Sequence, residues 1–142
     1  HLKEPAMIKP IMKSEFFLRL PSEDAGPDDA ATGQDLLDTL HEHERECVGL
    51  AANMIGVRKR IICVKDGNRA LLMYNPQILE QVNVYQTSEG CLSLVGERPC
   101  TRYRRIKVEY LDENFVHRIK NFSGYTAEII QHEIDHCDGI VI

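Results

Sequence analysis

The pattern His132-Glu133-Ile134-Asp135-His136 constrains this chain more than any other part of its sequence. Apolar spacing predicts a helix over 126–137, and Asp138-Gly139 is a typical helix end. Histidines four positions apart lie on the same face of a helix, so both imidazoles can bind one metal ion. Glu133 follows His132 directly and can reach water bound to that ion. The pattern therefore predicts a metal site on the last helix.

The third ligand of this predicted metal site is not given by the pattern itself. A catalytic metal usually has about three protein ligands and one open position. A further histidine of one protease pattern is absent because Ile142 holds its place, and a glutamate on a later helix is excluded because the sequence ends there. The ligand is therefore expected upstream or, with poorer geometry, at Cys137 or Asp138. The upstream candidates are histidines and cysteines: His41, His43, His117, Cys47, Cys63, Cys91 and Cys100.

Cys91 has the most favourable setting among these candidates. Gly90 precedes it and allows the backbone to approach an ion closely. A bound metal also deprotonates a coordinating thiol, which makes cysteine a strong ligand. The alternative for any single cysteine is a small, buried apolar side chain.

Several strands are expected in the middle of the sequence. Short apolar runs over 61–64 and 70–74 predict two strands that form a hairpin across a turn at 65–68. Strict alternation over 105–112 predicts a half-buried antiparallel strand. Residues 117–122 are expected to pair with that strand after a turn.

A helix precedes the predicted strands, and the metal-binding helix follows them. Leucines at helical spacing within 28–46 predict an N-terminal amphipathic helix. The order of helix, strands and helix, without an internal repeat, favours one α+β domain over residues 1–142. We interpret residues 1–6 as a non-native remnant ahead of a start at Met7.

Composition and charge exclude several classes of function. Hydrophobic residues make up 43% of the 142 residues, which is enough for a globular core, and the longest apolar runs fall short of a membrane span. A net charge of -5 disfavours DNA or RNA as a partner. The five cysteines are odd in number and irregularly spaced, which favours a reducing cytoplasm over a secreted fold.

Three segments together resemble the peptide deformylases, in which G-x-G-x-A-A-x-Q, E-G-C-x-S and H-E-x-x-H occur in this order. The second pattern is intact at 89–93 (EGCLS) and the third at 132–136 (HEIDH). The first reads CVGLAANM over 47–54. The strand near 102–112 also resembles the family, so the resemblance spans most of residues 36–140.

The resemblance implies antiparallel strands packed around a C-terminal metal-binding helix, and an active site with defined roles. Cys91, His132 and His136 are the implied metal ligands, and Glu133 handles the proton of the activated water. The family removes the formyl group from the N-terminal methionine of new polypeptides and releases formate. Fe²⁺ is the expected ion, and Zn²⁺, Ni²⁺ or Co²⁺ can occupy the same site.

Met54 is the main departure from the family pattern. The family stabilises the oxyanion with the backbone N–H after the cysteine, here that of Leu92, and with a glutamine amide at the position of Met54. Methionine has no N–H to donate. Losing one such donor lowers the rate by about 10² to 10³, so we expect reduced activity. An alternative is that the adjacent Asn53 supplies the amide.

The resemblance also implies substrate-binding positions. Val48 and Gly49 are expected to contact the bound peptide, together with Glu128 and Ile129 on the last helix. Glu128 places a charge where related proteins have an apolar residue, so it is expected to narrow or redirect substrate choice. Cys47 replaces a glycine, which is harmless only if its φ angle is negative.

Two groups of basic residues have less specific roles. Arg102 is expected to pair with Glu89 and so to support the ligand loop. The basic runs at 58–60 and 102–107 are interpreted as solvated faces, although ribosome proximity is an alternative.

The expected partners are formylmethionyl peptides or nascent chains. A peptide-binding relative with weak or no catalysis, or a hydrolase of another N-acyl group, is the competing hypothesis.

Overall fold

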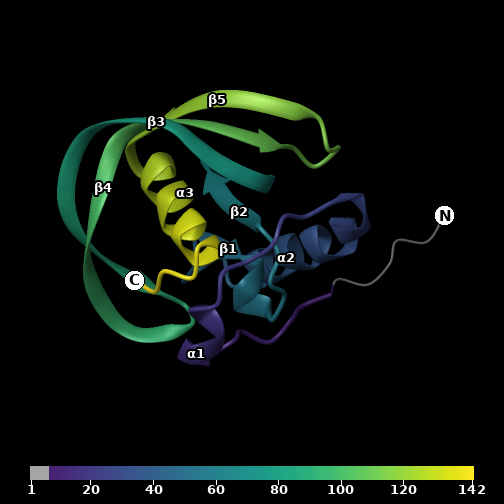
Figure 1. Cartoon of the computed structure of the whole chain (residues 1–142). Helices are drawn as coiled ribbons and strands as arrows, with labels where there is room; N and C mark the ends of the chain where they lie inside the picture. The colour runs from purple at the N-terminus through teal and green to yellow at the C-terminus, as the bar shows by residue number, and fades with distance from the viewer. Residues whose placement is uncertain (1–6) are drawn as a thin grey trace.

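The computed structural model describes residues 7–142, and the predicted remnant at residues 1–6 lies outside this range. The described chain contains a five-stranded sheet with the order β1-β2-β3-β4-β5, in which every neighbouring pair is antiparallel (Figure 1). The strands are β1 Gly49–Ala51, β2 Ile61–Asp66, β3 Arg69–Cys91, β4 Leu94–Leu111 and β5 His117–Ser123. Sequential strands are therefore neighbours throughout the sheet.

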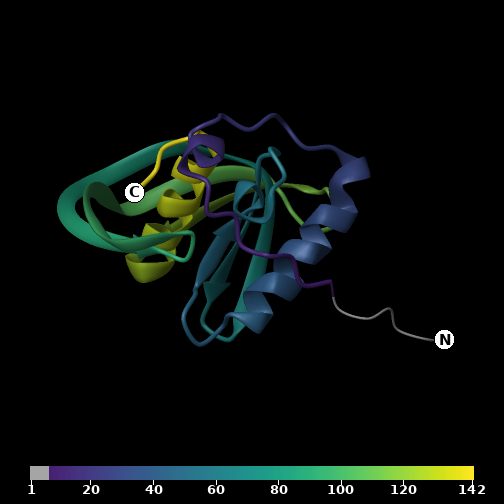
Figure 2. The same cartoon turned by 90° about the horizontal axis from the view of Figure 1, so that it is seen from below.

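Helices pack on both faces of the first part of the sheet. They are α1 Glu15–Leu18, α2 Ala30–Glu42 and α3 Gly124–Cys137, with short 3₁₀ turns η1 Pro27–Asp29 and η2 Ala52–Ile55. Figure 2 shows α2 and α3 on opposite sides of β1 and β2. Four consecutive residues of β2, Ile61–Val64, are consequently buried, which explains why this strand is apolar without alternation.

The long ribbon formed by β3 and β4 curves around α3 (Figure 1). Its pairing register shifts between Tyr74 and Gln77, between Ile78 and Glu80, and again between Gly90 and Cys91. Such bulges bend a strand and increase its twist. The curvature brings the far end of the ribbon, with Cys91, back to the C-terminal half of α3.

The structure confirms the α+β architecture, the N-terminal and C-terminal helices and the predicted hairpins. Ile106, Val108 and Tyr110 are buried on β4, as their alternation predicts. Most buried apolar residues of the described chain belong to one core cluster around α3 and β2. Description of the entire chain as a single domain stays a prediction.

Three predicted boundaries are wrong. The N-terminal helix ends at Glu42, because residues 43–46 form turns rather than a fourth helical turn. The hairpin strand predicted to end at residue 74 extends to Cys91, and the strand predicted from residue 105 begins at Leu94. Much of this added ribbon is exposed, so backbone pairing maintains it without an alternating apolar face.

Candidate metal centre and active site

The end of β3 and one face of α3 bring three metal-binding side chains together. One possible ligand atom from each of Cys91, His132 and His136 lies within 4.8 Å of the others. Cys91 Sγ is 3.3 Å from His136 Nε2, and the two imidazole centroids are 5.0 Å apart. The four-residue spacing on the helix aligns the histidines, whereas the curved ribbon supplies the cysteine.

The other candidates for a third ligand, including Cys47, Cys63 and Cys100, lie outside this group of three. The three upstream histidines pair with carboxylates in the contacts His41–Glu44, His43–Glu46 and His117–Glu109. Asp138 forms an ion pair with Arg60 at 2.7 Å, and Cys137 is buried in the core cluster. Within residues 7–142, none of these residues belongs to a group of three potential ligands.

The donor set formed by Cys91, His132 and His136 suits a divalent transition metal. Thiolate and imidazole are ligands of zinc and of other first-row metals, and three of them leave an open coordination position. Burial lowers the pKa of His136 to about 3, so its imidazole is neutral, which is the form that binds a metal. The residues present therefore fit a metal ion.

Buried polar contacts hold the imidazole of His132. Its Nδ1 lies 2.7 Å from Oε1 of Glu89, and Arg102 donates to both carboxylate oxygens of Glu89. Burial alone would raise the pKa of Glu89, but hydrogen bonds from His132 and Arg102 hold it below its usual range. The ionised Glu89 accepts a hydrogen bond from Nδ1–H of His132, which leaves Nε2 of His132 free to act as a ligand. The predicted pairing of Arg102 with Glu89 is present.

Glu133 places a buried carboxylate beside the three potential ligands. It is only 4% exposed, and its Oε1 has no hydrogen-bond partner among the described residues. Burial raises the pKa of Glu133 to about 7. A carboxylate with a pKa near neutrality can both accept and return a proton at physiological pH.

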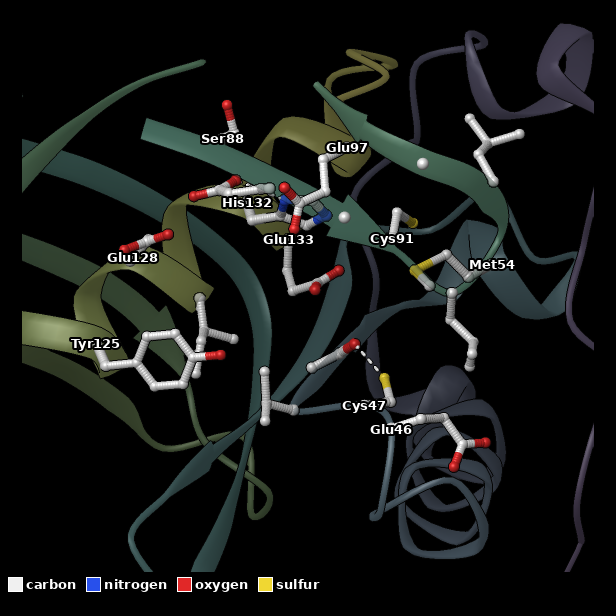
Figure 3. Close-up of a pocket in the computed structure, with 18 of the residues that line it drawn as sticks. Glu46, Cys47, Met54, Ser88, Cys91, Glu97, Tyr125, Glu128, His132 and Glu133 are labelled. Carbon is white, nitrogen blue, oxygen red and sulfur yellow. Dashed lines mark hydrogen bonds and ion pairs between the residues drawn. The ribbon is translucent and has the colours of Figure 1, made fainter. Parts of the chain in front are cut away.

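A cleft of about 690 Å³ opens beside this cluster (Figure 3). Nearly all residues that the sequence assigned to the site line the cleft: Val48, Gly49, Met54, Cys91, Leu92, Glu128, Ile129, His132 and Glu133. His136 is instead buried behind it, with 1% of its surface exposed. The cleft is therefore large enough for several side chains of a peptide and has the polar cluster in its wall.

Met54 and Asn53 point to different environments. Met54 lines the cleft, and its Sδ accepts a hydrogen bond of 3.4 Å from the backbone N–H of Ala51. Asn53 is buried, and its amide donates to the backbone carbonyl of His136 at 2.9 Å. The amide of Asn53 therefore serves the end of α3, and the alternative that it replaces the missing glutamine is wrong.

Residues 47–54, which carry the first of the three motifs, tolerate a cysteine at position 47 but require the glycine at position 49. The non-glycine residues with positive φ in the described chain are Asn75, Asn83 and Phe115, so Cys47 has no left-handed strain. Its thiol donates to the carbonyl of Gly49 at 3.0 Å, as drawn in Figure 3. A Cβ on Gly49 would lie 2.7 Å from Ile129 Cγ2 and 3.0 Å from Glu133 Oε2. The glycine thus allows β1 to approach α3 closely.

Tyr125 and Glu128 form the opposite side of the cleft (Figure 3). The hydroxyl of Tyr85 donates to Oε1 of Glu128 at 2.9 Å. Burial and, to a smaller extent, this hydrogen bond raise the pKa of Tyr85 to about 12, so the hydroxyl keeps its proton. Tyr125 was missed by the sequence analysis, although it lies four positions before Ile129 on the same helix face. Glu97 also lines the cleft, and no sequence signal indicates that Glu97 or Tyr85 lies near the site.

The sequence matches proteins of one family over nearly its full length. The model of the polypeptide deformylase family matches residues 11–142. The peptide deformylase of Clostridium beijerinckii is 52% identical over 136 residues, which cover 96% of this chain and 100% of that protein. The peptide deformylase of Thermus thermophilus is 35% identical over 126 residues, and this match covers 76% of this chain and 65% of that protein.

Solved structures of the same family share the fold. A class I type b peptide deformylase from Acinetobacter baumannii superposes with a TM-score of 0.85 at 30% identity, covering 95% of this chain and 97% of that one. The crystal structure of a peptide deformylase from Thermus thermophilus gives 0.86 at 34% identity, covering 95% and 84%. Among residues 7–142, we find no helix with the length and apolar character required to cross a membrane. Sequence and structure together establish that this chain belongs to the peptide deformylase family of metal-dependent hydrolases.

Proposed function

We propose that this chain hydrolyses the N-formyl group of formylmethionyl peptides on nascent polypeptides and releases formate. The observation that carries the proposal is the group of Cys91, His132 and His136 beside the buried carboxylate of Glu133. A structure of the Acinetobacter baumannii relative, 29% identical with a TM-score of 0.84, contains a bound Met-Ala-Ser peptide. That complex supports a peptide beginning with methionine as the class of ligand.

Cys91, His132 and His136 would hold one divalent metal ion. Fe²⁺ is the expected ion, and Zn²⁺, Ni²⁺ or Co²⁺ suits the same donors. When bound, the ion supplies Lewis acidity and makes a water molecule nucleophilic near neutral pH. Glu89 fixes the ring of His132 so that Nε2 faces the site.

Glu133 moves the proton in this reaction. Its unpartnered, buried oxygen accepts a proton from the attacking water, which adds to the formyl carbon. Glu133 then returns the proton to the amino nitrogen as the C–N bond breaks, giving the free peptide amine and formate. The pKa of Glu133, raised to about 7 by burial, suits both steps.

The remaining residues of the cleft bind and polarise the peptide. The backbone N–H of Leu92 would donate to the developing oxyanion, while Met54 offers no second donor. Val48 and Gly49 would contact the backbone of the peptide, and Ile129 and Glu128 would lie near its first side chain. Because one donor is missing, we expect a slower reaction than a glutamine at position 54 would give.

The proposed substrate places the reaction in the cytoplasm, where nascent chains emerge. Proximity to the ribosome is a further prediction, whereas DNA and membranes are not expected partners. We also propose that residues 1–142 act as a single deformylase domain. The acidic net charge of -5 agrees with a peptide substrate rather than a nucleic acid.

Formate release from formyl-Met-Ala-Ser by Fe²⁺-loaded protein tests this function. We expect turnover by the wild type and a loss of about 10² to 10⁴ in kcat for Glu133→Ala, because general acid–base catalysis typically contributes this factor. Acetyl-Met-Ala-Ser and an internal peptide serve as control substrates and should react far more slowly. Equal rates for wild type and Glu133→Ala, or a preference for the acetylated peptide, would contradict the proposal.

A further inference from the structure

A chain of hydrogen bonds between side chains, most of them buried, links the helix and the ribbon that carry the potential metal ligands, and the backbone of α3 closes this chain into a ring. His132 Nδ1 on α3 contacts Oε1 of Glu89 on β3 at 2.7 Å. Glu89 accepts from Nε and Nη2 of Arg102 on β4 at 2.7 to 3.2 Å. The third nitrogen, Nη1 of Arg102, donates to Oδ2 of Asp135 at 2.7 Å. Asp135 lies on α3 again, three positions after His132, and closes the ring.

The ring joins the two elements that carry the potential metal ligands. Glu89 precedes Cys91 by two residues on β3, and the last register shift between β3 and β4 lies between Gly90 and Cys91. Asp135 lies between His132 and His136 on α3. Arg102 therefore binds one element through Glu89 and the other through Asp135. The two contacts thus connect the segment that carries the thiol with the segment that carries both imidazoles.

We propose that Asp135 is a positioning residue for the metal site, acting through Arg102 and Glu89 on the geometry of Cys91, His132 and His136. This inference rests on the proposed function, since it requires that these three side chains bind a metal. Asp135 does not line the cleft of the cluster, but a separate depression that also contains Asp138. Its effect on the site therefore passes through the ring and not through direct contact with substrate.

The surroundings of Arg102 explain why Asp135 matters. The side chain of Arg102 is only 5% exposed, and a buried donor that loses its partner carries a desolvation penalty. Without Asp135, Nη1 of Arg102 would keep only the carbonyl of Thr101, at 3.3 Å. Glu89 would then be the one remaining carboxylate that holds the guanidinium among the described residues. A small rotation of the guanidinium would move the carboxylate of Glu89 and, with it, the imidazole of His132.

The same helix end offers a matched control. Asp138 forms an ion pair with Arg60 that is also 2.7 Å long, and its side chain is more exposed. Arg60 contacts neither Glu89 nor His132 among the hydrogen bonds of the described residues; besides Asp138, its guanidinium contacts the carbonyl of Pro76. Asp138→Ala therefore removes an equivalent acid–arginine pair without opening the ring.

Zn²⁺ affinity, measured by competition with a chelator, tests the role of Asp135. We expect Asp135→Ala to bind Zn²⁺ roughly 10- to 100-fold more weakly than wild type, as is typical for residues that support metal ligands. Asp135→Asn keeps an acceptor oxygen, so its Zn²⁺ affinity should lie between those of Asp135→Ala and the wild type. Asp138→Ala should match the wild type. The visible spectrum of the Co²⁺ protein provides a second readout and should change in Asp135→Ala but not in Asp138→Ala.

Each outcome distinguishes the alternatives. If Asp135→Ala and Asp135→Asn bind Zn²⁺ as tightly as wild type with unchanged Co²⁺ spectra, the inference is wrong. If Asp138→Ala weakens binding equally, a general effect on the helix end explains the result and the inference is also wrong. If wild-type protein binds no Zn²⁺, the proposed metal site itself fails. Far-UV circular dichroism identifies any unfolded variant, in which case Asp135→Asn decides the result.

Discussion

The thiol of Cys91 lies 3.3 Å from Nε2 of His136, although 45 positions separate the two residues in the sequence. This contact joins the end of the long β3–β4 ribbon to the buried face of α3. With His132, it forms a compact set of donors beside Glu133. The proposed chemistry depends on this meeting of strand and helix.

Replacing Cys91 should weaken the metal site selectively. Cys91→Ser substitutes a hydroxyl for the thiol, which is a poorer ligand for a transition metal, so we expect at least a roughly tenfold loss of Zn²⁺ affinity. Elemental analysis after dialysis against a chelator measures retention. Cys47→Ser is the control, because Cys47 lines the same cleft but lies outside the ligand group. Full retention by Cys91→Ser would remove this residue from the site.

Restoring an amide at position 54 should increase activity. In Met54→Gln, the side-chain oxygen can accept from the Ala51 N–H as Sδ does now, while the amide N–H₂ can donate to the oxyanion. We expect kcat for formyl-Met-Ala-Ser to rise by roughly 10- to 100-fold, below the full effect of an oxyanion donor. Met54→Leu, which adds no donor, is the comparison. An unchanged or lower kcat in Met54→Gln would show that another group already serves the oxyanion.

The close approach at Gly49 gives a prediction about both stability and rate. The Cβ of Gly49→Ala would press on Ile129 and on the carboxylate of Glu133. Overpacking of this kind costs about 1–3 kcal/mol, so we expect a lower free energy of unfolding together with a reduced kcat. Gly26→Ala is the control, because its Cβ meets no atom within 4 Å. Urea unfolding and formate release measure the two effects, and wild-type values for both in Gly49→Ala would contradict the proposed packing.

Glu128 should influence the binding of the substrate's first side chain. Replacing this carboxylate with an apolar group in Glu128→Leu should favour methionine and lower KM about 3- to 10-fold, since one buried CH₂ contributes about 0.8 kcal/mol. The kcat should change little, because the effect is on uniform binding. Tyr85→Phe removes the 2.9 Å hydrogen bond to Glu128 but keeps the carboxylate of Glu128, so the KM of this variant should not fall. Steady-state kinetics with formyl-Met-Ala-Ser check this, and an unchanged KM in Glu128→Leu would place the side chain outside the pocket.

Features that depend on local periodicity could be predicted from the amino-acid order. The four-residue spacing of His132 and His136 put both imidazoles on one helix face, and alternation over 105–112 gave the buried face of β4. The order of helix, strands and helix gave the α+β class. From the residues alone, however, the third ligand remained open among several histidines and cysteines, and only the resemblance to the family assigned it to Cys91.

Which elements meet became known only from the folded chain. Exposed residues in much of the β3–β4 ribbon carry no apolar alternation, so its length and curvature come from backbone pairing and register shifts. The same holds for Asn53, whose amide turns toward the carbonyl of His136, and for Asp135, whose partner Arg102 lies on β4. Periodicity fixes which side chains share a face of one element, whereas packing between elements fixes the distances between them.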